Sequence, residues 1–113
     1  MDFFKYYFNE DEWTIYLIDD DDNVISEEHV AAEVKFAEKE ILVRKNQINY
    51  RTISHELWHV YFKYCYLEDT GEMVLSDIEE VCASLFEDKG ERILTKAKDI
   101  EKKLIELRDK NVE

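Results

Sequence analysis

Two histidines four residues apart, with a glutamate beside the first, are the residues best suited to chemistry in this chain. The stretch 52–62 reads TISHELWHVYF and contains His55, Glu56 and His59. Side chains at i and i+4 share one face of a helix, so the two imidazoles can bind one zinc ion. The carboxylate at i+1 flanks that face and can take a proton from a water molecule. The pattern predicts a metal-dependent hydrolase. The alternatives are chance and a metal-free histidine pair that needs hydrogen-bond partners of its own.

A catalytic zinc site needs a third protein ligand and one position open to water. Cys65 would continue the same helix, about three turns beyond His55, which is too far to share its metal. His29 is the only other histidine and lies in a polar stretch. A carboxylate on the next helix is therefore the better candidate.

The stretch EEVCASLF supplies two such carboxylates, Glu79 and Glu80. At 100° per residue, the apolar stripe of this helix centres near Ile78, Cys82 and Leu85. Glu79 falls on the edge of that stripe and Glu80 nearly opposite it, so Glu79 is favoured as the ligand. The alternative for both is an acid near a helix N-terminus that interacts favourably with the helix dipole.

The elements that must hold this site are predicted from side-chain periodicity. Residues 13–19 (WTIYLID) are rich in β-branched and aromatic side chains and predict a strand. Residues 3–8 fit either a strand paired with it or a short helix. Residues 31–45 alternate apolar and charged side chains and predict a hairpin that turns at AEKE.

From about Asn49 the period becomes helical and the side chains are apolar nearly all round, which predicts a helix through the middle of the domain. SDIE at 76–79 is a capping-box pattern that opens a second helix. The expected buried stripe of that helix is Ile78, Val81, Cys82, Leu85 and Phe86. We expect Gly90 to interrupt it, before an amphipathic C-terminal helix with Ile93, Ala97, Ile100, Leu104 and Leu107 on its apolar side.

Length and composition favour one folded domain over residues 1–113, since 45% of the 113 residues are hydrophobic and no linker is visible. No apolar run is long enough to span a bilayer, and the N-terminus has no basic signal-peptide start. A cytoplasmic location is therefore expected. Cys65 and Cys82 are too few for a disulfide scaffold and are expected to be reduced, buried thiols.

The formal net charge is −13. Such a surface repels nucleic acid and anionic membranes, so neither is expected as a partner, and neutral or basic partners are favoured. Solubility is the simplest role for this charge. The alternative function is an acidic interaction protein, such as a phage-encoded inhibitor or a DNA mimic, that acts by binding. The oligomeric state stays open.

HELWH followed by EEVCASLF, which begins 20 residues after His59, resembles the gluzincin pattern of zinc metallopeptidases. The chain is similar in size to minigluzincins and to peptidase domains of the ImmA/IrrE kind, and the resemblance covers roughly residues 31–90. It implies that His55, His59 and Glu79 hold Zn²⁺ and that Glu56 is the general base. It also implies a peptide or protein substrate that pairs with an edge strand at 40–45.

The third-ligand motif of that family, E-x-x-A-N-x-F-A, matches Glu79, Cys82, Ala83, Leu85 and Phe86. The chain departs from the family where a glycine is common before the second histidine, since this position is Trp58. It also has Ala83 where an Asn or Asp supports a ligand. Candidates for stabilising an oxyanion are Tyr61, Tyr64 and Tyr66.

The expected fold is α+β, with a small antiparallel sheet packed on a central H-E-x-x-H helix, then a ligand-bearing helix and a long C-terminal helix. A third functional possibility is an inactive, zymogen-like state whose cleft is plugged by the chain's own tail.

Overall fold

The computed structural model describes residues 2–8, 10–20, 31–62 and 75–110, and for 75–79 and 81 it describes the helical backbone alone. A four-stranded sheet and two α-helices make up this part of the chain, so the α+β class is confirmed. The elements are β1 (Asp2–Phe8), β2 (Asp11–Ile18), β3 (Ala32–Lys35), β4 (Glu40–Arg44), α1 (Tyr50–Phe62) and α2 (Leu75–Lys110).

The sheet joins two hairpins side by side in the order β1-β2-β4-β3. β1 pairs with β2 and β3 pairs with β4 in antiparallel fashion, whereas β2 and β4 are parallel. The sheet is therefore mixed and differs from the expected antiparallel sheet at its central pair. Residues 3–8, which fitted a strand or a helix, are a strand.

β3 is an edge strand of this sheet, and β4 lies between β2 and β3. The expected edge strand at 40–45 was wrong, because the partner on its second side is β2, which is distant in sequence. Within the β3–β4 hairpin, the edge that the described residues leave unpaired belongs to β3. This strand also packs against α1.

One face of the sheet packs against the two helices to form the core. Trp13, Ile15 and Leu17 of β2 face this core, and Ile18 on the opposite face packs with Leu42 in a second, smaller buried cluster. The helices contribute two sets of buried side chains, Ile53, Leu57, Val60 and Tyr61 from α1 and Leu85, Ile93, Ala97, Ile100 and Leu104 from α2. The predicted apolar side of the C-terminal helix is thus confirmed, with Leu107 half-buried at its end.

α2 runs without a break through Gly90, so the expected interruption there was wrong. Glycine costs about 1 kcal/mol relative to alanine in a helix interior, which the burial of neighbouring side chains outweighs. A Cβ at this position would lie 3.4 Å from Cδ2 of the Phe86 ring, an ordinary van der Waals contact.

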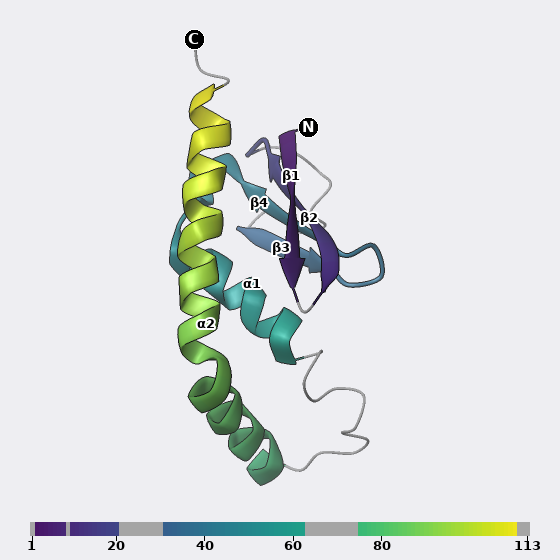
Figure 1. The fold of residues 1–113 in the computed structure, drawn as a ribbon, viewed down its shortest axis with the longest axis vertical. Coiled ribbons are helices and arrows are strands. Elements are labelled where there is room, and N and C mark those ends of the chain that lie inside the picture. Colours follow the sequence, from purple (N-terminus) through teal and green to yellow (C-terminus); the bar gives the residue numbers. More distant parts are fainter. Residues whose placement is uncertain (1, 9, 21–30, 63–74, 111–113) are drawn as a thin grey trace.

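The stripe expected on the first half of α2 is only partly buried. Leu85 is buried, but Cys82 is exposed and Phe86 is 70% exposed. The expectation of a buried Cys82 thiol was therefore wrong, since this half of α2 extends beyond the sheet that would cover it (Figure 1). Cys65 lies outside the described residues.

α2 follows the longest dimension of the molecule, which measures 50 × 27 × 22 Å. Its C-terminal half lies beside the sheet, and α1 crosses between the sheet and the N-terminal half (Figure 1). Within the described residues, neither helix has the length of apolar sequence that crossing a membrane requires.

Candidate active site

The start of α1 is held by two acceptors for its free backbone amides. Asn49 is the cap, since its Oδ1 accepts a 2.9 Å hydrogen bond from the backbone N–H of Thr52. Glu101 of α2 accepts a 2.7 Å hydrogen bond from the backbone N–H of Tyr50. A carboxylate here also interacts favourably with the positive end of the helix dipole. These contacts fix the first turn of α1 against α2.

The two histidines lie on the exposed face of α1, opposite its buried side chains. Ile53, Leu57 and Val60 are fully buried, whereas His55 and His59 are exposed. The helix is therefore amphipathic rather than enclosed on all sides, and it presents its histidines to solvent. This placement suits residues that bind an ion and a substrate.

The histidine side chains converge. The Nε2 atoms of His55 and His59 are 3.3 Å apart, and the ring planes meet at 79°. In a tetrahedral zinc site with Zn–N bonds of about 2.0–2.1 Å, two ligand nitrogens lie about 3.3–3.4 Å apart. Burial, and then the charge of His55, lower the pKa of His59 and so favour the neutral imidazole that binds metals. The separation fits a hydrogen bond between the two rings, and it also fits two ligands of one zinc ion.

Glu56 lies between the exposed and buried sides of α1 and is only 8% exposed. Burial raises the pKa of its carboxyl group to about 7, and the charge of Glu33 on β3 contributes to the rise. Glu33 itself has a buried Oε2 that meets no hydrogen-bond partner among the described residues. A carboxyl group with a pKa near 7 is well matched to proton transfer at neutral pH.

A pocket of about 400 Å³ lies next to Glu56, where the start of β3 faces the first turns of α1. Two small side chains, Ala31 and Ala32, form its strand wall. Arg51, Thr52, His55 and Glu56 form its helix wall. The sequence interpretation missed Arg51, although its position four residues before His55 places it on the same face of the helix.

The opposite flank of the histidine pair is aromatic. Trp58 of α1 stacks on Phe86 of α2. Trp58, at the position where the gluzincin pattern commonly has glycine, therefore joins the two helices. With the pocket on one side and this stack on the other, the histidines lie between β3 and α2.

The structure brings together two of the three predicted zinc ligands within the described residues, His55 and His59. Among them, no group of three His, Cys, Asp or Glu side chains lies close enough to hold a metal ion. Glu79 belongs to α2, but its side chain is outside the described part, and Glu80 is exposed. His29, Tyr64 and Tyr66 also lie outside it. Tyr61 is fully buried on the core side of α1, away from the histidines.

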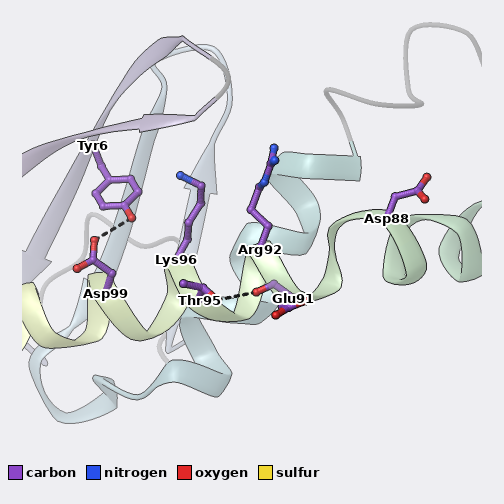
Figure 2. Close-up of a pocket in the computed structure, with 7 residues that line it drawn as sticks. All are labelled: Tyr6, Asp88, Glu91, Arg92, Thr95, Lys96 and Asp99. Atoms are coloured by element: carbon purple, nitrogen blue, oxygen red, sulfur yellow. Dashed lines mark hydrogen bonds between the residues drawn. The ribbon is translucent and has the colours of Figure 1, made fainter.

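A larger groove, of about 750 Å³, lies between β1 and α2, and neither histidine lines it. Figure 2 shows several of its polar groups engaged with one another. The Tyr6 hydroxyl donates a 2.9 Å hydrogen bond to Asp99, and the Lys96 ammonium lies 5.3 Å from the centre of the Tyr6 ring. It is a charged seam that joins β1 to α2, and none of its residues belongs to the H-E-x-x-H stretch.

Comparison of the chain with protein-family models, with curated proteins and with solved structures finds no match.

Proposed function

We propose that this protein is a zinc-dependent metallopeptidase in which His55 and His59 bind the ion and Glu56 is the general base. The observation that supports the proposal most directly is the 3.3 Å separation of the two Nε2 atoms, which matches the edge of a zinc tetrahedron. The partly buried carboxyl group beside them supplies the base that the chemistry needs.

Glu79 is the proposed third ligand. It lies seven residues before Phe86, so helical spacing puts it two turns from the stack on Trp58 and on the same side of α2. This leaves the fourth position open to water, as a catalytic rather than a structural zinc site requires.

Zinc in this site would polarise the peptide carbonyl and lower the pKa of a water molecule. Glu56 takes the proton of the attacking water and delivers it to the leaving amine nitrogen. The burial of Glu56 raises the pKa of its carboxyl group, and this favours its role as a proton acceptor.

The edge of β3 that the described residues leave unpaired suits an extended peptide substrate. The backbone N–H of Arg44 donates to the oxygen of Ala31, so residues 31, 33 and 35 hold the hydrogen bonds to β4. The backbone groups of Ala32 and Val34 then point away from the sheet, where an added strand would bind them. This edge flanks the pocket beside Glu56.

The experiment that tests the proposal compares wild type with Glu56→Gln, and with Glu38→Gln as a control at an exposed glutamate. Each protein is assayed for zinc and for cleavage of a degenerate peptide library read by mass spectrometry. Wild type and Glu38→Gln should cleave. Glu56→Gln should keep its zinc and lose on the order of 10²–10⁴-fold in rate.

Equal cleavage by Glu56→Gln, or no cleavage by zinc-loaded wild type, would overturn the peptidase. The net charge of −13 would then favour the acidic interaction protein, whose binding does not depend on one carboxylate beside a metal.

A further inference from the structure

We infer that Arg51 binds a carboxylate of the substrate in the pocket between β3 and α1. The peptidase would then prefer peptides with an acidic group near the cleaved bond. The inference rests on the proposed function and adds a substrate class to it. Arg51 is a cation in a chain of net charge −13, and it lines a pocket.

The space is built by small side chains on one wall. Ala31 and Ala32 face Arg51 and Thr52 across a volume of about 400 Å³. Because Ala32 is only 3% exposed, the strand wall is formed by packed structure. A side chain of a bound peptide can enter this volume next to Glu56.

The guanidinium of Arg51 is available to a ligand. Among the described residues it forms no ion pair and no hydrogen bond, and its nearest aromatic neighbour is the Tyr50 ring, 6.0 Å from its Cζ. By contrast, Arg44 is buried and its guanidinium donates to the backbone oxygens of Asp19 and Asp20. Arg51 is thus placed for recognition, whereas Arg44 supports the fold.

The charges that line the pocket single out Arg51 as its cationic side chain. Among the described residues of the lining, Glu56 is acidic and Arg51 alone has a permanent positive charge, while the proposed zinc would lie at the His55 edge. A planar guanidinium can hold both carboxylate oxygens at once, which an ammonium cannot. Arg51 therefore decides whether this pocket accepts a carboxylate.

The carboxylate can belong to an Asp or Glu side chain or to the C-terminus of the peptide. The two sources are separated by testing each peptide with a free and with an amidated C-terminus. An effect that survives amidation belongs to the side chain.

The first arm of the experiment uses the degenerate peptide library with zinc-loaded wild type, Arg51→Gln and Arg51→Glu. Arg92→Gln is the control, since it removes an exposed arginine of α2 outside this pocket. Wild type and Arg92→Gln should share an enrichment for an acidic group at one fixed position. Arg51→Gln should lose this enrichment, and Arg51→Glu should replace it with a preference for Lys or Arg.

The second arm measures binding without turnover. In a Glu56→Gln background, the affinity for a Glu-containing peptide is compared with that for the same peptide carrying Gln. Adding Arg51→Gln should weaken binding of the Glu peptide by about tenfold and leave the Gln peptide within twofold. Circular dichroism of each variant confirms that the fold is kept.

The outcomes distinguish a failure of the carboxylate pocket from a failure of the proposed peptidase. Glu56-dependent cleavage with no difference between Arg51 and Arg92 variants overturns the carboxylate pocket and leaves the peptidase standing. Arg51-dependent binding of the Glu peptide without cleavage overturns the peptidase and keeps the pocket. Binding that ignores Arg51 overturns the pocket in either case.

Discussion

Trp58 of α1 and Phe86 of α2 stack with their ring planes 3° from parallel and their ring centroids 6.2 Å apart. Phe86 is nevertheless 70% exposed, so this contact is an offset stack at the surface. It joins the helix with the histidines to the half of α2 that contains Glu79.

Phe86→Ala should therefore loosen the N-terminal half of α2 from α1. We expect a loss of about 0.5–1.5 kcal/mol in unfolding free energy and a red shift of Trp58 emission. Urea unfolding measures the free energy and the native-state emission spectrum measures the shift, to which Trp13 adds a constant background because it is buried in the core. Leu94→Ala, at a half-exposed site on the same helix, is the control. Unchanged emission in Phe86→Ala would contradict the stack.

Zinc binding should need residues from both helices. Wild type purified without added metal should hold about one zinc per chain, and His55→Ala and His59→Ala should lose it. Glu79→Gln should weaken zinc affinity by more than the roughly 10–100-fold that loss of an outer-shell partner costs. Glu80→Gln is the matched control, because Glu80 is exposed. Full occupancy in both histidine variants, or a larger effect at Glu80, would refute the proposed ligands.

A proline at the edge of β3 that no described strand pairs with should impair peptide binding without breaking the sheet. Val34→Pro removes an outward-pointing N–H, whereas the hydrogen bonds to β4 come from residues 31, 33 and 35. In a Glu56→Gln background we expect peptide affinity to fall by roughly two- to tenfold, the worth of one hydrogen bond. Val34→Ala trims the side chain and keeps the N–H. Equal affinity of the two variants would argue against a substrate strand at this edge.

Stability at alkaline pH should depend on Tyr6. Burial, then the hydrogen bond to Asp99, and then the charge of Asp99 raise the pKa of its hydroxyl in the folded protein. The folded state thus holds this proton more tightly than the unfolded chain. The stabilisation is fully present below pH 10, the ordinary tyrosine pKa, and is lost as the pH rises above it.

Tyr6→Phe removes that contribution. Between pH 8 and pH 11, the stability difference between wild type and Tyr6→Phe should shrink as the pH rises, as measured by urea midpoints. Asp99→Asn, which removes the carboxylate but keeps the tyrosine, should reduce the same pH dependence. A difference that stays constant across this range would show that Tyr6 has no raised pKa.

Features carried by local periodicity could be predicted from the sequence. Helix α1, the β3–β4 hairpin and the apolar side of the C-terminal half of α2 each repeat within a few residues, and the structure contains all three. The shared face of His55 and His59 follows from the same helical spacing.

Features that depend on distant partners could not be predicted in this way. Alternation within a strand is the same for parallel and antiparallel neighbours, so it left the pairing of β2 with β4 undetermined. The burial of Glu56 and the charge of Glu33 beside it depend on which strand forms the edge. Gly90 was misleading, because burial along α2 outweighs its low helix propensity.

Because α2 is one unbroken helix, the direction of each side chain in its N-terminal half is fixed relative to the side chains in its C-terminal half. Its C-terminal half is fixed in the core by Ile93, Ala97 and Ile100, and its N-terminal half contains Glu79. One residue inserted near Gly90 would rotate the two halves by about 100° relative to each other. The core packing of the C-terminal half could then persist while residue 79 turned away from the side of α2 that contains Phe86. Under the proposed ligand set, insertions here are tolerated only as whole turns, so this helix sets the direction of Glu79 as well as supporting the fold.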